Sequence, residues 1–384
     1  MNKAFKNEKI TRKVFLQKAC LFCLGAGLSS YALQSVLRRD AYASGSGLNM
    51  REAKYYKKID EETVQCMLCP RGCTLTQGQR SFCRVREMQD GKLQTLVYGR
   101  PCSLAVDPIE KKPFFHFLPG SSVFSLATAG CNFRCKYCQN WQISQSLPEE
   151  VNSYSVSPGD IISQARENNC PSIAYTYTDP VIFYEYMLDI AKEAKANGIR
   201  NTCHTNGCFR HEPANEIAGY LSAANIDLKS FNQDFYTDVC AGFLQPVLDT
   251  LKIFKEHKVW IEITNLLVPT LNDDLGEIQE MCIWIRDNLG RDVPLHFSRF
   301  WPQYKLTGLP ATPIETLEEA WKLAKDSGLN YAYIGNVPGH PAEHTYCPSC
   351  AKPVIKRSGY VVLENNVVNG RCEFCGAGIA GVWD

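Results

Sequence analysis

The sequence predicts an α/β protein whose main part is a partial (β/α)6, TIM-like barrel, flanked by two cysteine-bearing regions. Between residues 122 and 334, short apolar segments alternate with segments of helical periodicity, which is typical of parallel βαβ units. Cysteines gather in short Cys-x2-Cys units on both sides of that stretch. The length of 384 residues leaves room for both appendages beside a barrel of roughly 200 to 250 residues.

We therefore expect a leader, a cysteine-rich region, the barrel and a C-terminal module, at 1–43, 44–120, 121–340 and 341–384. The strands expected in the barrel are 122–129, 172–178, 201–205, 225–229, 260–268, 294–300 and a short last one at 331–334. In such barrels the functional residues sit at the C-terminal ends of the strands and in the loops that follow.

Composition narrows the range of functions. A net charge of +1 gives no general attraction to nucleic acid or to an anionic membrane, so we expect no nucleic-acid partner. The 19 cysteines are an odd number and are clustered in a long chain. That usage indicates metal ligands rather than a disulfide framework.

Four cysteines lie close together in the N-terminal region, at Cys66, Cys69, Cys73 and Cys83. Proline and glycine residues between them allow tight turns. Four thiolates at this spacing can close a tetrahedral zinc site or hold an iron–sulfur cluster. The separate Cys102 is open to three interpretations: a fifth ligand, a reactive thiol or a buried side chain.

The loop after the first barrel strand contains a Cys-x3-Cys-x2-Cys pattern, formed by Cys131, Cys135 and Cys138. Three thiolates in so short a loop can each ligate one iron of a cubane cluster. The fourth iron then has no protein ligand, and an open metal position is where chemistry takes place. The alternative is a zinc loop with a distant fourth ligand, but two other cysteine groups already resemble closed sites.

This loop, with an aromatic residue at Tyr137, resembles the cluster motif of the radical S-adenosylmethionine (SAM) enzymes. The resemblance implies a [4Fe–4S] cluster whose open iron binds SAM, and the usual partial-barrel fold of that family. It also implies an external electron donor and reductive cleavage of SAM to a 5′-deoxyadenosyl radical that abstracts hydrogen. Tyr137 and Asn140 further resemble the branch that contains activating enzymes for glycyl-radical proteins.

The resemblance assigns SAM-binding roles to polar residues of the cluster loop and of the expected strand ends. These residues are Tyr137, Asn140, Thr178, Asp179, Asn206, Asp227, Lys229 and Asn265. Asp179 would bind the amino group, although an Asp before Pro is also a typical helix N-cap. Alternation puts Asp227 and Lys229 on one face, where they contact the SAM carboxylate and ribose or form a structural ion pair. Asn265 is expected at the adenine or ribose.

Two histidines are weak candidates for proton donors or substrate ligands. His204 ends the third expected strand, and His296 lies in the sixth. The alternative for each is a histidine satisfied inside the core. No catalytic residue is assigned on the acceptor side, because the cofactor generates the radical.

An aromatic loop leads into the first barrel strand. It spans 106–120 and contains several proline residues and a final glycine. Together with 98–102 and the preceding cysteines, it resembles the radical SAM component of the AmmeMemoRadiSam system. The resemblance runs from about residue 54 to the C-terminus and includes 333–339 and 381–383. It implies partners of the Memo and AMMECR families, and a substrate that is either a protein or a small molecule.

Two Cys-x2-Cys knuckles lie near the C-terminus, at Cys347, Cys350, Cys372 and Cys375. A strand pattern at 359–363 and an Asn-Gly hairpin turn separate them. The pattern predicts a zinc-ribbon or rubredoxin-like four-cysteine site. Zinc would be a structural ion, whereas a redox-active iron would make the module an electron relay.

The first 43 residues contain a basic stretch, an apolar run at 19–37 and an Ala-x-Ala site at 41–43, which is a signal-peptide pattern. The segment 11–16 resembles a twin-arginine signal in which lysine replaces the second arginine. Export of a folded, cofactor-loaded protein suits that route, whereas SAM chemistry suggests the cytoplasm. An uncleaved amphipathic leader on the membrane is the alternative.

The sequence thus predicts a radical SAM enzyme of the activating-enzyme kind. Its substrate is a protein from which hydrogen is taken at a glycine, or a small molecule. Two other classes remain open: a non-catalytic iron–sulfur electron-transfer protein, and a zinc-ribbon interaction module with an inactive barrel.

Overall fold

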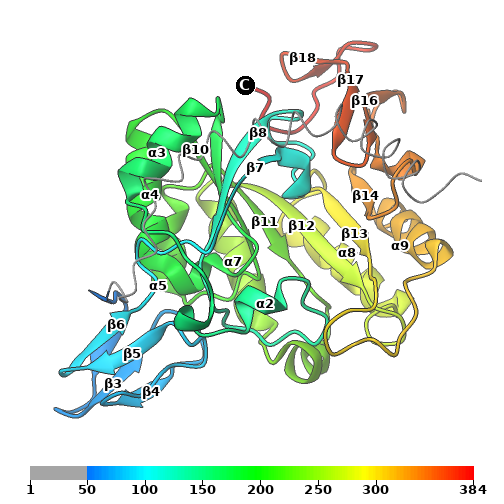
Figure 1. Ribbon diagram of the computed structural model, residues 1–384. Helices are drawn as coiled ribbons and strands as arrows, with labels where there is room; N and C mark the ends of the chain where they lie inside the picture. Colours follow the sequence, from blue (N-terminus) through cyan, green and yellow to red (C-terminus); the bar gives the residue numbers. More distant parts are fainter. Residues whose placement is uncertain (1–49) are drawn as a thin grey trace, which may run out of the picture. The chain divides into compact units, whose positions relative to one another are not determined.

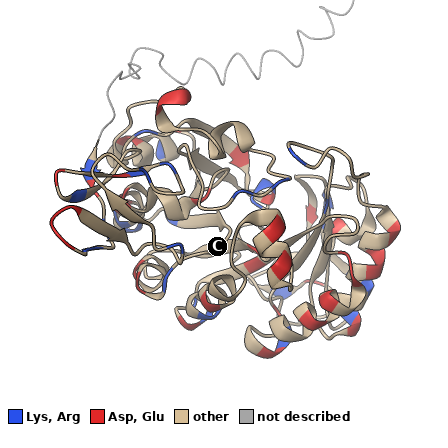
Figure 2. Cartoon of the chain, turned by 90° about the horizontal axis from the view of Figure 1, so that it is seen from below, with Lys and Arg blue, Asp and Glu red and all other residues tan. Residues whose placement is uncertain are grey.

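The computed structural model describes residues 50–384 (Figure 1). The expected leader, 1–43, and the signal-like pattern within it lie outside the described residues. Among residues 50–384, no helix is both long and apolar enough to cross a membrane. Lys and Arg are interspersed with Asp and Glu along the described helices and loops (Figure 2), in keeping with the near-zero net charge.

An eight-stranded mixed sheet forms the centre, in the order β14-β13-β12-β11-β10-β9-β8-β7. Its strands are β7 Ser103–Pro108, β8 Ser122–Ala127, β9 Ser172–Tyr175, β10 Arg200–Thr205, β11 Ala223–Asp227, β12 Trp260–Leu267, β13 Leu295–Arg299 and β14 Ala332–Gly335. Neighbouring strands from β8 to β14 pair in parallel, as the alternation of strand and helix patterns predicts. The α/β class is therefore confirmed, and the closure into a partial barrel stays a prediction.

The strand β7 was not foreseen. It pairs antiparallel with β8 along its whole length, from Ser103 opposite Ala127 to Pro108 opposite Ser122. The sequence pattern indicates a loop at 106–120, because Pro108 comes near its start. In the structure Pro108 is the last residue of an edge strand, where its missing N–H costs no hydrogen bond between strands. Pairing with β8, rather than the local sequence pattern, makes this segment a strand.

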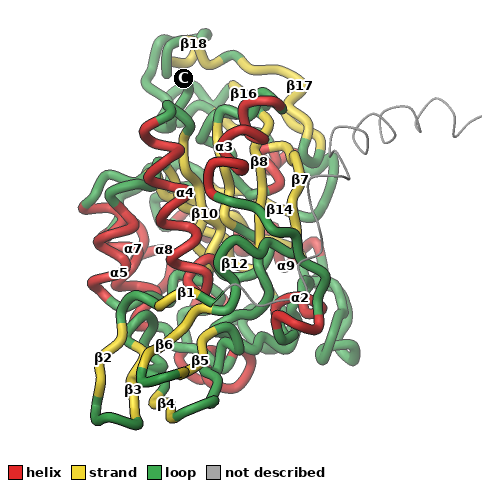
Figure 3. The backbone as a smooth tube through the Cα atoms, turned by 60° about the vertical axis from the view of Figure 1, so that its left-hand side comes forward, coloured by secondary structure: helices red, strands yellow, loops and turns green. Residues whose placement is uncertain are grey.

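Helices connect the parallel strands, and most begin at recognisable caps. They are α3 Pro158–Glu167, α4 Tyr184–Ala196, α5 His211–Ala218, α7 Gln245–Glu256, α8 Leu275–Asn288 and α9 Ile314–Asp326. Ser157 and Asp160 form a capping box at the start of α3, and Asp274 caps α8. Contacts of α3, α4, α7 and α9 with the strands bury their apolar faces against the sheet; Figure 3 shows α4, α5, α7 and α8 beside the strands.

The N-terminal region forms two small antiparallel sheets, β1-β6-β5 and β2-β3-β4. Their strands are β1 Arg51–Glu52, β2 Tyr56–Lys58, β3 Thr63–Cys66, β4 Thr74–Thr76, β5 Arg86–Gln89 and β6 Lys92–Thr95. A buried ion pair of 2.5 Å between Arg86 and Glu185 ties this region to α4. The region lies on the same side of the molecule as the short helix α2 Trp141–Ser144 (Figure 1).

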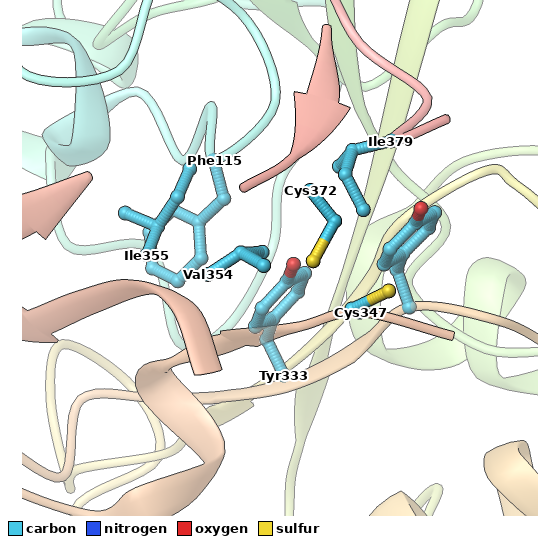
Figure 4. Packing of buried hydrophobic residues seen from close by; sticks show 8 residues of the cluster. Phe115, Tyr333, Cys347, Val354, Ile355, Cys372 and Ile379 are labelled. Atoms are coloured by element: carbon cyan, nitrogen blue, oxygen red, sulfur yellow. The ribbon is translucent and has the colours of Figure 1, made fainter. Parts of the chain in front are cut away.

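The C-terminal module lies at the opposite end of the sheet (Figure 1). Its strands are β15 Thr345–Tyr346, β16 Pro353–Ser358, β17 Val361–Asn365, β18 Val367–Val368 and β19 Arg371–Cys372. Buried apolar residues join the module to the segment before β8: Phe115, Tyr333, Val354, Ile355 and Ile379 pack around Cys347 and Cys372 (Figure 4). The buried Arg357 strengthens this contact, because its guanidinium donates to the Phe115 carbonyl at 2.7 Å.

Candidate active site

The cluster loop, residues 130–140, follows β8 and begins at a glycine that no other residue could replace without strain. Gly130 has φ +92°, and a Cβ atom there would lie 2.5 Å from the Cys83 carbonyl oxygen and 2.6 Å from a Val85 methyl. Only glycine combines this left-handed backbone with so close an approach. The N-terminal cysteine region therefore packs directly against the residue that precedes Cys131.

The three cysteines of the loop lie in largely buried surroundings. Cys135 is buried, and Cys131 and Cys138 are partly buried. Burial, followed by the nearby charge of Asp179 and of neighbouring thiols, raises the pKa of Cys131 well above its usual value; burial likewise raises that of Cys138. Such thiols become thiolates when metal cations compensate the charge, as iron does.

A π-helix, residues Tyr236–Cys240, holds the loop from the other side, and sequence reasoning missed it. The amides of Arg134 and Lys136 donate to the carbonyls of Cys240 and Val239 at 2.8 and 2.9 Å. The Cys240 thiol contacts the Tyr137 hydroxyl at 3.4 Å and lies near the thiol of Cys135. Single-turn π segments occur often at functional sites. No local pattern of ligand spacing marks Cys240, because it lies about a hundred residues from the loop.

Asp179 lies directly after β9, at the C-terminal edge of the sheet. Its carboxylate accepts hydrogen bonds from the amides of Val181 at 3.0 Å and Asn206 at 2.7 Å, and from the Thr205 hydroxyl at 3.0 Å. The bond from Val181 makes Asp179 the N-cap of the short helix Pro180–Phe183, as the alternative interpretation had it. Burial raises its pKa to about 6, although these donors favour the carboxylate. The side chain is thus a buried acid next to the cluster loop.

Asp227 and Lys229 share one face at the end of β11, as alternation predicts. The Lys229 ammonium lies 2.9 Å from one carboxylate oxygen of Asp227, and Nε2 of His204 lies 2.9 Å from the other. Burial would raise the pKa of Asp227, but the charges of Lys229 and His204 lower it well below its usual value. The Lys229 ammonium also lies 5.9 Å from the ring centre of Tyr137. The fold therefore joins these three side chains to the cluster loop.

Asn265 combines a satisfied donor with a buried, unpaired acceptor. Its Nδ2 donates to the Leu228 carbonyl at 2.7 Å, whereas its Oδ1 has no hydrogen-bond partner. Asn265 also lines a cavity of about 10 Å³ together with Asn272 and Ser230. An unpaired buried acceptor is costly unless a ligand or water supplies a donor.

Three other residues that the resemblance assigns to SAM binding form hydrogen bonds within the protein. Asn206 donates to the Asn132 side chain at 2.7 Å, Asn140 donates to the Tyr177 carbonyl at 2.8 Å, and Thr178 donates to the Thr128 carbonyl at 2.9 Å. Each of these bonds links the cluster loop, or the end of β8, to the ends of neighbouring strands. These side chains therefore position the site.

His296 has a buried structural partner, which agrees with the alternative stated for it. Its Nε2 lies 2.8 Å from the Glu262 carboxylate, and both side chains are buried. The same carboxylate accepts the backbone amides of Phe115 and His116. The pair thus anchors the segment that packs against the C-terminal module, and His296 is a histidine satisfied in the core.

The four C-terminal cysteines form a compact ligand set. The sulfur atoms of Cys347, Cys350, Cys372 and Cys375 all lie within 4.8 Å of one another, and within residues 50–384 this is the one group of at least three side chains that meets this spacing. Burial disfavours the Cys347 thiolate, but the amides of Cys350 and Ser349 hydrogen-bond it and its pKa falls to about 7. The donor set fits a single tetrahedral ion.

The three cysteines of the cluster loop fit an iron–sulfur cluster by their chemistry. They supply three thiolates on one loop, and the loop is tightly held by Gly130 and by the π-helix. Beside them lie a buried carboxylate and an ammonium. A zwitterionic nucleoside such as SAM would use groups of these kinds.

Comparisons with known proteins agree with this chemistry. A family model described as the radical SAM superfamily matches residues 125–282. The uncharacterized protein MJ0808 of Methanocaldococcus jannaschii is 49% identical over 331 residues, which are 85% of this chain and 98% of that protein. The putative glycyl-radical enzyme activating enzyme MJ1632 of the same organism is 27% identical over 171 residues, 42% of this chain and 62% of that protein.

A solved domain of pyruvate-formate lyase-activating enzyme from Bacteroides vulgatus is also similar, at 21% identity and a TM-score of 0.38. The match covers 42% of this chain and 98% of that one. The chain belongs to the radical SAM superfamily. Within that class, part of the chain is similar to a putative glycyl-radical enzyme activating enzyme.

Proposed function

We propose that Cys131, Cys135 and Cys138 ligate a [4Fe–4S] cluster, and that SAM binds its open iron. The observation that carries this proposal is the convergence of the three-cysteine loop with Asp179 and Asp227–Lys229 at one edge of the sheet. When bound, cluster and SAM together supply a 5′-deoxyadenosyl radical that abstracts hydrogen. The protein supplies binding, orientation and the exclusion of competing reactions.

The charged side chains of the site have distinct parts in SAM binding. Asp179 is placed beside Cys131 and offers a carboxylate to the SAM amino group. Lys229 offers an ammonium to the SAM carboxylate, while Asp227, shared between Lys229 and His204, keeps that ammonium charged in a buried place. Asn265 lies on the face of β12 opposite the one that Asp227 shares, so its role at the adenine or ribose stays a prediction.

We infer that the substrate is a protein, from which hydrogen is abstracted at a glycine. The similarity to a putative glycyl-radical enzyme activating enzyme supports this. A second support is the rim of the cluster loop, where Trp141 and Trp301 are 38% and 50% exposed. Tyr304 stacks on Trp141, and Gln303 donates to the loop carbonyl of Gln139 at 3.1 Å. Tryptophan and tyrosine are enriched in protein interfaces.

Partners similar to the Memo and AMMECR families follow from the narrower sequence resemblance, and we keep them as part of the proposal. A protein that delivers one electron to the cluster is also required. The Memo-like and AMMECR-like proteins would then provide or consume the modified substrate.

The test is reductive cleavage of SAM. Full-length protein with its cluster reconstituted anaerobically receives SAM and dithionite, and 5′-deoxyadenosine is measured by mass. A Cys135→Ala variant serves as the control, since it should lose the cluster and the product. A protein that holds the cluster, as shown by its spectrum, but forms no product would contradict the proposal and favour an electron-transfer protein.

A further inference from the structure

A strained turn connects β9 to Asp179. Tyr177 has φ +62°, in the left-handed region that a bulky side chain rarely adopts. The Thr178 amide donates to the Thr176 carbonyl at 2.8 Å, so these three residues form a γ-turn with Tyr177 at its centre. Such a backbone persists only where surrounding contacts fix it, and it is concentrated at functional sites.

The turn is joined to two parts of the proposed SAM site. The Tyr177 carbonyl accepts a hydrogen bond from Nδ2 of Asn140 in the cluster loop at 2.8 Å. Asp179, whose carboxylate is proposed to bind the SAM amino group, follows two residues after Tyr177. A change in the backbone conformation of Tyr177 would therefore move both Asn140 and this carboxylate.

An ion pair from a distant segment holds the side chain of Tyr177. The hydroxyl donates to the Asp107 carboxylate, and the Lys112 ammonium lies 4.0 Å from the centre of the tyrosine ring. Lys112 and Asp107 form an ion pair of 2.6 Å, and their side chains are 2% and 7% exposed. The Lys111 ammonium lies 2.9 Å from the other carboxylate oxygen. One carboxylate thus binds the phenol and two ammonium groups.

The ionisation states of this group suit the hydrogen bond. Burial would raise the pKa of Asp107, but hydrogen bonds from Lys112, Tyr177 and Lys111 lower it well below its usual value. Burial, followed by the hydrogen bond to Asp107, raises the pKa of Tyr177 above its usual value. The carboxylate is therefore ionised at neutral pH, and the phenol keeps the proton that it donates.

Asp107 lies on the sheet face that carries the charged residues of the proposed SAM site. It stands opposite Val123 of β8, and the registers of the next strands put Val123 on the same face as Asp227. The segment 107–112 thus connects the edge strand β7 to the turn at the end of β9. No pairing within the local sequence predicts this connection, because Tyr177 lies about seventy residues from Asp107.

We propose that Tyr177 is a positioning residue for SAM binding, and that Asp107 and Lys112 act through it. The ion pair holds the tyrosine side chain, the side chain fixes the strained turn, and the turn places Asn140 and Asp179. This inference rests on the proposed binding of SAM at this site. It gives residues of the 106–120 segment a part in the reaction without contact to the cofactor.

The test measures SAM affinity separately from cluster content. Full-length protein is reconstituted anaerobically, its iron is counted, and SAM binding is measured by calorimetry without a reductant, so that no SAM is cleaved. Tyr177→Phe keeps the ring and removes only the hydroxyl. We expect its SAM dissociation constant to rise about tenfold or more, the usual effect of losing such a supporting group. Its iron content should stay that of the native chain.

Tyr175→Phe is the matched control, because Tyr175 is a buried tyrosine of β9 whose hydroxyl donates to Asn201 at 2.9 Å. It should lower the free energy of unfolding and leave SAM affinity unchanged. Asp107→Ala removes the acceptor of the Tyr177 hydroxyl and should weaken SAM binding as well. The double variant Asp107→Ala/Tyr177→Phe should lose less affinity than the sum of the two single losses, because both changes remove the same contact.

Two results would overturn this inference alone. One is equal SAM affinity in the native chain and in Tyr177→Phe. The other is an equal loss in Tyr175→Phe, which would indicate a general effect of stability. Tyr177→Phe and its control decide the matter by themselves if the Asp107→Ala chain does not fold. A native chain that holds its cluster but binds no SAM would overturn the proposed function, and this inference with it.

Discussion

The sulfur of Cys240 lies 3.4 Å from the hydroxyl oxygen of Tyr137. The same thiol lies near that of Cys135, and the π-helix that carries it also pairs with the backbone of the cluster loop. Hydrogen bonds to the sulfur ligands are one determinant of the reduction potential of an iron–sulfur cluster. Cys240 is therefore a positioning residue for the cluster, acting through Cys135.

Changing Cys240 to Ala should lower the reduction potential of the cluster, because a donor to a cluster sulfur is lost. We expect SAM cleavage to slow about tenfold or more, the usual effect of losing such a supporting group. The potential is measured by a redox titration followed by electron paramagnetic resonance. Cys240→Ser keeps a donor and should restore most of the potential. An unchanged potential in the Ala variant would refute this role.

Gly130→Ala should destabilise the protein and lower its iron content. A left-handed backbone costs an alanine about 1 to 2 kcal/mol, and the overlap with the Cys83 carbonyl and Val85 adds about 1 to 3 kcal/mol more. The matched control is Gly78→Ala, where φ is +74° but no atom lies within 4 Å. Urea unfolding and iron analysis of both variants measure the difference. Equal losses would show that the close approach has no effect.

The protein should lose stability between pH 6.5 and pH 4 through His116. Burial lowers the pKa of this histidine from 6.5 to about 4 in the folded state, where it bonds the Tyr333 hydroxyl and the Ala380 carbonyl. The unfolded chain therefore binds more protons within this window, so stability is complete above pH 6.5 and falls as the pH drops towards 4.

From pH 7 to pH 5 this group alone should remove about 2 kcal/mol from the free energy of unfolding. The measurement is urea unfolding of the native chain and of a His116→Gln variant at both pH values. The variant is less stable at pH 7 but should lose less stability on acidification. Other groups that face His116, including Glu262, Arg357 and His296, stay the same in the two proteins. Parallel losses in both proteins would exclude His116 as the cause.

Breaking the C-terminal four-cysteine group should affect stability rather than SAM cleavage. Cys347→Ala breaks the four-thiol set and loosens the apolar cluster around Tyr333 and Val354, so we expect a lower melting temperature and the loss of one bound ion. The module lies at the far end of the sheet from the cluster loop, so 5′-deoxyadenosine formation per folded chain should be preserved. A large loss of that activity at unchanged stability would instead support an electron relay.

Local patterns predicted a large part of this structure. Alternating strand and helix segments predicted the parallel strands from β8 to β14, because apolar periodicity reports burial directly. The two Cys-x2-Cys pairs predicted the compact C-terminal group. Each pair is already close in sequence, so one contact between the two pairs brings all four cysteines together. Alternation also placed Asp227 and Lys229 on one face. The leader, the metal in each closed site and the partners stay predictions.

The sequence by itself determined the class of enzyme, because the cluster ligands lie within eight residues and their spacing is a local property. Only the tertiary structure decided which distant groups join them. It brought Cys240 to the cluster loop, and it placed His296 with Glu262 in the core. The reason is physical: a contact between distant residues depends on how strands and loops pack, and no single segment carries that information.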